Sequence, residues 1–386
     1  MMKKVLFYNG SLRMGGIERV LVEVLQNIDR SKMSIDLLIE DGIKSLNVFE
    51  KDIPKDIKIY YLKPEELIQK TDFYRKNKKN FFYKIIYNIM MNYEGYIKKK
   101  NLNKIIKNRI YDVVIDFDMG LSKYIDLIKA EKKIAWIHAS IKNWYEKESK
   151  IRRLEKRLGK YTKIVTICDE MKRETEKIFP SLKNKLIRIY NPFNFERIRK
   201  LAENHNEINM KLYNQDYIIS IARLTLHQKD FLTLIKGFKL AKESGIKDKL
   251  YILGDGPDKE KIQNMINEEK MEKAIFLLGN VKNPYPWIKN SKMLVHSSKY
   301  EGFGLVLVEA LVLEKTVISS KCPTGPKEIL ENGEIGFLYE IGDYRKLAEL
   351  IIENLENNIL LEKINQKIQK YSVEKVIKEY EKIILN

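Results

Sequence analysis

The densest concentration of residues that could do chemistry lies in residues 299–311, whose sequence is KYEGFGLVLVEAL. In this segment Glu301 and Glu309 are separated by seven residues, and the glycines fall where a helix is expected to begin. A glycine-rich turn that leads into a helix presents backbone N–H groups and the positive end of the helix dipole, which together form an anion site. We expect the two glutamates to hydrogen-bond hydroxyl groups in different parts of one ligand, such as a sugar and a ribose.

Two cations could complete an anion site in residues 220–230, which read SIARLTLHQKD. Arg223 and Lys229 directly follow the first strand expected in the second half of the chain. An anion bound without a metal must be neutralised by fixed cations, which this pair could supply.

These segments resemble a known family of enzymes. The Glu301 to Glu309 spacing, with Gly-Phe-Gly-Leu after the first glutamate, resembles the E-x7-E motif of retaining GT-B glycosyltransferases of family four, the glycosyl transferases group 1. Residues 322–330 (CPTGPKEIL) are similar to the segment that follows this motif in bacterial members that build capsule, lipopolysaccharide or lipid-linked glycans. The resemblance implies a nucleotide-diphosphate sugar as the donor, with uridine as the nucleoside.

The resemblance also implies a role for individual residues. Glu301 would be catalytic, and Glu309 would bind the ribose. The donor diphosphate would be bound by Arg223, Lys229, Gly15, Gly16, Phe303, Gly304 and Leu305. Gly15 and Gly16 belong to residues 10–18 (GSLRMGGIE), which are similar to the family's Gly-Gly loop between the first strand and the first helix. Five residues separate Arg223 from Lys229, whereas four is commoner in the family. Lys229 therefore departs from the family's spacing, and Arg223 does not.

Three further positions lie where strands are expected to end. His138 closes the expected strand 133–138, at the edge where doubly wound folds bind ligands. By resemblance it would act in catalysis by hydrogen-bonding the transferred sugar close to the reacting carbon, although a packed structural histidine is the alternative. Turns containing Gly254, Asn280 and Val281 close two strands of the second half, and we expect their backbone to contact the nucleoside.

Short β-branched apolar runs alternate with helical stretches along the whole chain, which is typical of parallel α/β sheets. The expected strands are 4–9, 34–40, 58–62, 112–117, 133–138, 163–168, 186–190, 217–222, 249–253, 274–278, 293–297 and 316–320. We predict an α/β protein of GT-B type, with two doubly wound Rossmann-like domains and a cleft between them. The expected domains are an acceptor-side domain, 1–195, a nucleotide-sugar-binding domain, 196–370, and a terminal helix, 371–386, that crosses back to the first domain.

Asp116 and Asp118 form a D-x-D pair, which in metal-dependent GT-A transferases holds Mn²⁺ or Mg²⁺ against the diphosphate. The alternative is a strand cap followed by a solvated residue, and we favour it because Arg223 and Lys229 already supply positive charge. Cys168 and Cys322 lie far apart and match no metal-ligand spacing. We therefore expect no metal and no cofactor.

The positive charge is concentrated in the first half of the chain. Residues 1–200 hold 45 Lys and Arg against 26 Asp and Glu, whereas residues 201–386 hold 27 of each. Residues 75–109 hold eleven Lys and Arg and a single acid, Glu94. The same segment has apolar residues at helical spacing, namely Phe82, Ile85, Ile86, Ile89, Tyr93 and Tyr96. This helix either lies in the interface of an anionic bilayer or packs its apolar stripe on the sheet with its lysines solvated.

Together these patterns predict a metal-independent, retaining glycosyltransferase that acts in cell-surface polysaccharide biosynthesis. It would transfer a sugar from a UDP-sugar to a glycan or a lipid-linked glycan. No apolar run is long enough to span a membrane, so we expect a cytoplasmic protein with a peripheral contact at the inner face of the cell membrane. The alternatives are another GT-B enzyme, either a phosphorylase or a nucleotide-sugar epimerase, and a basic nucleic-acid-binding protein. No nucleic-acid-binding motif is evident, so no nucleic acid is expected as a partner.

Overall fold

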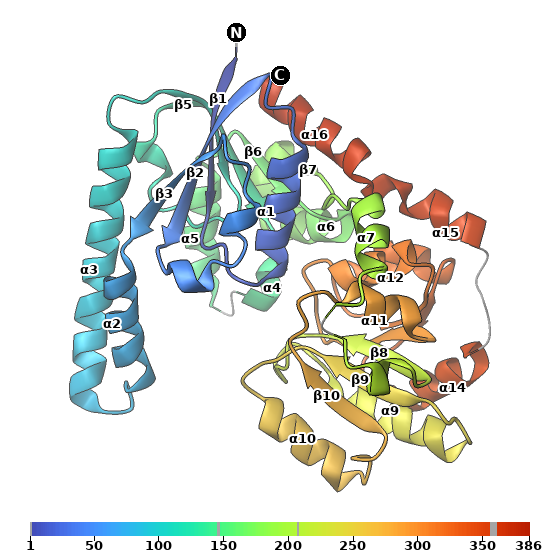
Figure 1. The fold of residues 1–386 in the computed structure, drawn as a ribbon. Helices are drawn as coiled ribbons and strands as arrows, with labels where there is room; N and C mark the ends of the chain where they lie inside the picture. Colours follow the sequence, from blue (N-terminus) through green and yellow to red (C-terminus); the bar gives the residue numbers. More distant parts are fainter. Residues whose placement is uncertain (1, 145–146, 207, 356–360) are drawn as a thin grey trace. The chain divides into compact units, whose positions relative to one another are not determined.

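The computed structural model describes residues 2–144, 147–206, 208–355 and 361–386 (Figure 1). The chain divides into two compact units, each assembled from more than one segment of the sequence. The first unit comprises Met1–Ile167, Lys172–Pro192 and Val376–Asn386, and the second comprises Cys168–Met171 and Phe193–Lys375.

The first unit is built on a seven-stranded parallel sheet with strand order β3-β2-β1-β4-β5-β6-β7. The strands are β1 (Lys3–Asn9), β2 (Met33–Asp41), β3 (Lys58–Lys63), β4 (Tyr111–Asp116), β5 (Ala130–Ile137), β6 (Lys163–Thr166) and β7 (Leu186–Arg188). The central strand β1 buries Val5, Leu6 and Phe7 completely on both faces, as expected for a parallel strand covered by helices on each side.

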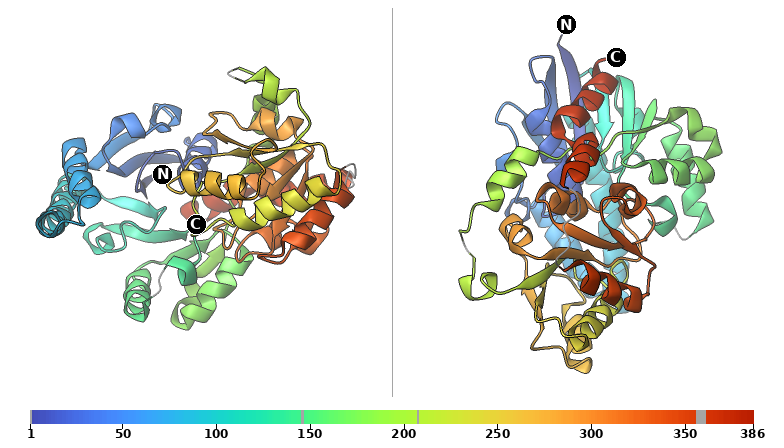
Figure 2. Two further views of the ribbon diagram at one scale, coloured as in Figure 1. Left: turned by 90° about the horizontal axis from the view of Figure 1, so that it is seen from below. Right: turned by 90° about the vertical axis from the view of Figure 1, so that its right-hand side faces the viewer.

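The helices of this part of the chain are α1 (Gly16–Asn27), α2 (Glu65–Lys76), α3 (Phe81–Ile106), α4 (Ile141–Trp144), α5 (Glu148–Leu158) and α6 (Asp169–Ile178). Helices α2 and α3 lie side by side next to the edge strand β3, and they extend past the ends of the strands (Figure 1). The terminal helix α16 (Val373–Leu385) contributes Tyr380, whose ring stacks on the buried Trp136 of β5 at a centroid distance of 5.0 Å. Figure 2 shows α16 against the strands of the first unit.

The second unit is built on a six-stranded parallel sheet with strand order β10-β9-β8-β11-β12-β13. Its strands are β8 (Tyr217–Ile221), β9 (Lys249–Leu253), β10 (Ile275–Gly279), β11 (Met293–His296), β12 (Thr316–Ser320) and β13 (Phe337–Tyr339). Its helices are α7 (Phe195–Ala202), α8 (Met210–Tyr213), α9 (Phe231–Glu243), α10 (Lys259–Glu268), α11 (Tyr285–Asn290), α12 (Leu305–Val312), α13 (Pro326–Ile329), α14 (Tyr344–Asn354) and α15 (Leu361–Ile368).

Helices cover both faces of the second sheet. One layer contains α9, α10 and α14, and buries a core that includes Ile218 and Ile252 from the strands and Phe238 and Ile351 from the helices. The other layer contains α7, α11, α12 and α15. Each unit is thus a doubly wound α/β sheet, which confirms the predicted fold class for both.

One strand was missed by the sequence analysis. β13 is three residues long and follows Gly336, so it is too short to show the period of a strand. It is specified by its pairing with β12 and by the burial of Tyr339, whose hydroxyl donates to the carbonyl oxygen of His296 at 3.2 Å. In the described part of the chain, every helix is too short or too polar to cross a bilayer.

Candidate active site

Glu301 lies in the turn that connects β11 to α12. Gly304 caps the helix with φ of +96°, a left-handed conformation that favours glycine, and no side chain caps the first turn. The backbone N–H groups at this end of α12 therefore face outward from the helix, as an anion site requires. The predicted Phe303, Gly304 and Leu305 all lie at this end.

Residues 322–330 pack against the turn that carries Glu301 and hold its backbone in place. The N–H of Glu301 donates to the carbonyl oxygen of Pro323 at 3.1 Å, and the hydroxyl of Thr324 donates to the carbonyl oxygen of Glu301. Gly325 has φ of +110°, and a Cβ there would lie 1.8 Å from the carbonyl oxygen of Phe303. This close approach of two backbones explains the glycine and makes the two segments one structural unit.

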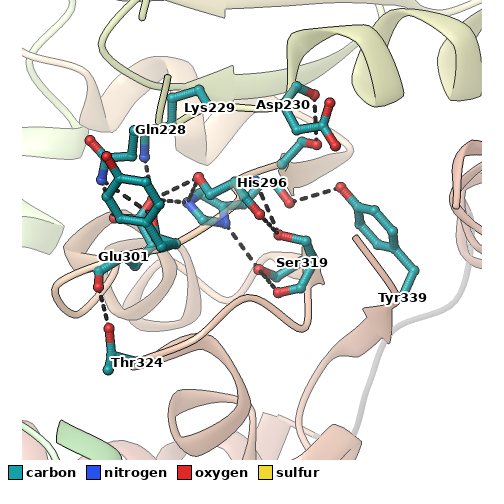
Figure 3. A network of polar contacts seen from close by, with 12 residues as sticks. Gln228, Lys229, Asp230, His296, Glu301, Ser319, Thr324 and Tyr339 are labelled. Carbon is teal, nitrogen blue, oxygen red and sulfur yellow. Dashed lines mark hydrogen bonds and ion pairs between the residues drawn. The ribbon is translucent and has the colours of Figure 1, made fainter. Parts of the chain in front are cut away.

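The carboxylate of Glu301 is buried and has four polar neighbours (Figure 3). Its Oε1 pairs with Nζ of Lys229, accepts from the hydroxyl of Ser298 at 2.7 Å, and lies 3.0 Å from Nε2 of His296. Nε2 of Gln228 donates to Oε2 at 3.4 Å. Burial raises the pKa of Glu301, but the positive charge of Lys229 and the bond from His296 outweigh it and hold that pKa well below its usual range.

His296 is buried, and burial lowers its pKa, which favours the neutral imidazole. Because the Glu301 carboxylate can only accept, Nε2 carries the ring proton and Nδ1 faces the hydroxyl of Ser319 at 3.0 Å. His296 was not assigned a role from the sequence. His296 is the last residue of β11, and no pattern in the sequence indicates that its side chain contacts Glu301, five positions later.

Lys229 lies on the loop after β8, which a β-bridge to Ser298 joins to the loop after β11. Asp230 follows it and caps α9, accepting from the N–H of Thr233 at 3.2 Å. The structure therefore places Lys229 on the Glu301 carboxylate, and its role toward a diphosphate stays a prediction. Arg223 is exposed at the end of β8 and has no ion-pair partner within the described residues.

Of the remaining predicted residues of the second unit, Gly254, Asn280 and Val281 lie at the carboxyl ends of strands, whereas Glu309 lies within α12. Glu309 is buried on α12, with the hydroxyl of Tyr285 3.4 Å from Oε1. Gly254 has φ of +131°, and a Cβ there would lie 2.0 Å from the carbonyl oxygen of Ala222. Its N–H donates to Gly279 at 2.8 Å, and Asn280 and Val281 follow that residue. The structure thus places Gly254, Asn280 and Val281 at the carboxyl edge of the sheet.

A second group of polar residues lies at the carboxyl edge of the first sheet, around a cavity of about 500 Å³. His138, directly after β5, lines it together with Asp118 and Lys98. The ring of His138 packs on Phe117 at a centroid distance of 4.7 Å, and burial lowers its pKa to about 3. Its Nε2 is buried and has no hydrogen-bond partner among the described residues.

Gly15 and Gly16 form the start of α1 in the same unit. Gly15 precedes the helix in an extended conformation without a capping side chain, and a Cβ there would lie 2.2 Å from Oε2 of Glu18. Glu18 in turn accepts from the hydroxyl of Ser11 at 2.6 Å. The loop is therefore held closed against its own helix.

Asp116 and Asp118 differ from the expected cap and solvated residue, because Asp116 is fully buried and Asp118 is half-buried and lines the cavity. Asp116 accepts from the hydroxyl of Tyr161 and from the N–H of Leu121. Asp118 accepts from the N–H of Gly10 at 2.6 Å and of Gly120 at 2.9 Å. Burial and the neighbouring carboxylate raise the pKa of Asp116 to about 7, and burial raises that of Asp118 to about 6. In the described residues no group of three or more potential metal ligands occurs.

Solved structures of other proteins have the same fold as this chain. The structure of Anabaena HepE, solved with UDP and glucose, superposes with a TM-score of 0.71 at 16% identity, covering 99% of each chain. The chain thus has the GT-B fold. Residues 202–371 match the family described as glycosyl transferases group 1. This match covers most of the second unit and agrees with the family that the motifs predicted.

Two curated relatives show the range of the family. An uncharacterized glycosyltransferase of Methanocaldococcus jannaschii is 32% identical over 58% of this chain and 64% of its own length. The N-acetylgalactosamine-N,N'-diacetylbacillosaminyl-diphospho-undecaprenol 4-alpha-N-acetylgalactosaminyltransferase of Campylobacter jejuni is 28% identical over 45% of each chain. The chain therefore covers less than two thirds of the length of either relative.

The burial of Glu301 with Lys229 gives a prediction on stability. Glu301→Gln should lower the free energy of unfolding by about 3 kcal/mol, because Lys229 is left buried without a counter-charge. The double variant Glu301→Gln/Lys229→Met should recover part of this loss, as measured by urea denaturation. Additive effects of the two substitutions would show that the pair is not coupled.

The aspartate pair gives a prediction on pH dependence. Because folding raises the pKa of Asp116 from its ordinary 3.8 to about 7, the folded state binds more protons than the unfolded one in this interval. The contribution of this group to stability therefore falls as pH rises from about 4 to 7. Asp116→Asn should lose this dependence, so its free energy of unfolding relative to the unsubstituted protein should rise with pH. Parallel pH profiles of the two proteins would contradict the prediction.

Proposed function

We propose that this protein is a retaining glycosyltransferase that transfers a sugar from a UDP-sugar to a glycan or lipid-linked glycan in cell-surface polysaccharide biosynthesis. The observation that carries the proposal is the anion site at the start of α12, where uncapped N–H groups lie beside the loop that carries Lys229. Arg223 is exposed at the end of the neighbouring strand β8. These groups can neutralise a diphosphate without a metal ion, and we propose a metal-independent reaction.

The donor would bind to the second unit. The diphosphate would accept hydrogen bonds from the N–H groups of Phe303, Gly304 and Leu305 and from the guanidinium group of Arg223. The ammonium group of Lys229 would turn from Glu301 toward the diphosphate. Glu309 would hold the ribose, and the turn at Gly254 and Asn280 would hold the base. As the sugar leaves, these fixed dipoles and charges stabilise the negative charge that develops on the phosphate.

The acceptor would bind to the cavity of the first unit. The unpartnered Nε2 of His138 would hydrogen-bond the transferred sugar close to the reacting carbon. Because its pKa is about 3, this histidine stays neutral at physiological pH and exchanges hydrogen bonds rather than charge. We propose that the departing phosphate takes the proton of the acceptor hydroxyl as the acceptor oxygen bonds to the anomeric carbon, with no side chain acting as a nucleophile. This route retains the configuration of the anomeric carbon.

The location of the acceptor is part of the proposal. The name of the Campylobacter relative describes transfer onto a diphospho-undecaprenol-linked sugar. A lipid-linked acceptor of that class would require the enzyme to work at the inner face of the cell membrane. The positive charge of residues 1–200 would favour a peripheral contact with an anionic surface.

Nuclear magnetic resonance of the product tests the reaction type. Incubation with a panel of nucleotide sugars should give slow release of one nucleoside diphosphate, with UDP-sugars as the expected donors. With the natural acceptor or a short analogue, the product should keep the anomeric configuration of the donor, and added EDTA should leave the rate unchanged. An inverted product would contradict retention, and loss of activity in EDTA would contradict metal independence.

Arg223 provides the sharpest test of the donor site. Arg223→Ala should reduce the rate of transfer by about a hundredfold or more and weaken nucleoside diphosphate binding, because one fixed cation of the leaving-group site is removed. Arg345→Ala is the matched control, since Arg345 is also exposed but lies on α14. Kinetics and calorimetry with UDP would measure both effects. Full activity of Arg223→Ala would remove this residue from the site.

A further inference from the structure

Helix α3 has two halves with different surroundings. Of its 26 residues, the buried ones are Glu94, Lys98 and Leu102, all in the second half. Lys63 of β3 forms an ion pair with Glu94 at 2.7 Å, and Lys98 pairs with Glu40 of β2. These pairs anchor the second half to the sheet. The first half extends beyond the strands with α2 beside it (Figure 1).

Helix α3 carries an apolar face, most of it on the first half, that the protein leaves in solvent. We define this outer stripe as Phe82, Ile85, Ile89, Tyr93 and Tyr96. Their side chains are exposed by 73%, 43%, 60%, 50% and 60%, respectively. Their spacing of three and four residues places them on one side of the helix. The alternative that this stripe packs on the sheet is therefore wrong for these five residues. A contiguous exposed apolar face of this kind marks an interaction surface.

The charge around the outer stripe is strongly positive. Of the eleven Lys and Arg in residues 75–109, Arg75, Lys98 and Arg109 form ion pairs with Asp72, Glu40 and Asp36. The other eight are exposed and have no ion-pair partner in the described part of the chain: Lys76, Lys78, Lys79, Lys84, Lys99, Lys100, Lys104 and Lys107. Glu94, the one acid of this segment, is already paired with Lys63. The partner of this surface must therefore be anionic as well as able to bury apolar side chains.

We propose that the outer stripe and its lysines dock the protein on an anionic lipid bilayer. An interfacial helix places aromatic and aliphatic side chains at the boundary between headgroups and acyl chains, while lysines contact the anionic headgroups. A second copy of this chain would bring two sets of unpaired lysines together, which disfavours it. A nucleic acid would satisfy the lysines but would leave the aliphatic Ile85 and Ile89 without a partner.

The docking surface is continuous with the cavity assigned to the acceptor. Tyr96 of the outer stripe lines a hollow together with Lys99 and Lys123, and Met91 and Gly95 of α3 line both this hollow and the cavity that contains His138. One helix therefore presents its outer face to the bilayer and its inner face to the acceptor site. This consequence rests on the proposed function, because it assigns an acceptor that reaches the cavity from the membrane surface.

Vesicle flotation tests the docking surface. The full chain should bind vesicles of phosphatidylglycerol and phosphatidylcholine and should not bind vesicles of phosphatidylcholine alone. The triple variant Phe82→Ser/Ile85→Ser/Ile89→Ser should weaken binding about tenfold or more, because it removes buried apolar area. Lys84→Gln/Lys99→Gln/Lys100→Gln should weaken binding most at low salt. These side chains are exposed, so the fold should be unchanged by circular dichroism.

The matched control is Leu232→Ser/Ile352→Ser, which removes apolar side chains exposed by 45% and 42% in the second unit. This control should bind vesicles as the unsubstituted protein does. Equal binding by the control and the outer-stripe variant would overturn the proposal. So would a failure of the full chain to bind anionic vesicles, retention on RNA that the outer-stripe variant leaves unchanged, or a dimer that the variant dissociates.

Release of UDP from a nucleotide sugar, measured in the same preparations without vesicles, separates this proposal from the proposed function. The outer-stripe variant should keep this activity, because none of its substitutions touches the donor site. Vesicle binding without consumption of any nucleotide sugar would disprove the transferase and leave the docking surface intact. Consumption of the donor without vesicle binding would disprove the docking surface and leave the transferase intact.

Discussion

The second unit depends on the compensation of one buried negative charge. The carboxylate of Glu301 pairs with Lys229 from the loop after β8 and contacts His296 at the end of β11 (Figure 3). The backbone carbonyl oxygen of Glu301 accepts from the hydroxyl of Thr324 in the loop after β12. A buried carboxylate is costly unless it is paired and hydrogen-bonded, so these partners must all be in place. The three loops are consequently held in one arrangement, and the start of α12 is held with them.

A similar constraint organises the first unit. The ammonium group of Lys98 in α3 donates to the hydroxyl of Tyr8 at 3.0 Å and to the carbonyl oxygen of Gly120 at 2.9 Å, and it pairs with Glu40. It thereby joins α3 to β1, β2 and the loop after β4. Asp118 adds hydrogen bonds from that loop to Gly10. The walls of the His138 cavity are therefore fixed by buried polar groups, and the same contacts leave the first half of α3 free of the sheet.

Both sites use the edge at which parallel strands end. In a parallel sheet every carboxyl end lies on the same side, so loops that are distant in the sequence meet there. This is why residues as far apart as Lys229, Glu301 and Thr324 form one cluster. It also explains why the chain requires glycines at Gly304 and Gly325, where the backbone turns through left-handed conformations to bring these loops together.

The sequence by itself determined the two alternating α/β units and the resemblance of residues 202–371 to glycosyl transferases group 1, because hydrophobic period and short glycine-containing motifs are local properties of the chain. It did not reveal β13, the contact of His296 with Glu301, or the burial of Asp116. It also left open whether the stripe of α3 is covered. These features were decided by tertiary structure alone, because burial and the partners of a charge depend on which distant segments pack against it, and no local spacing records that.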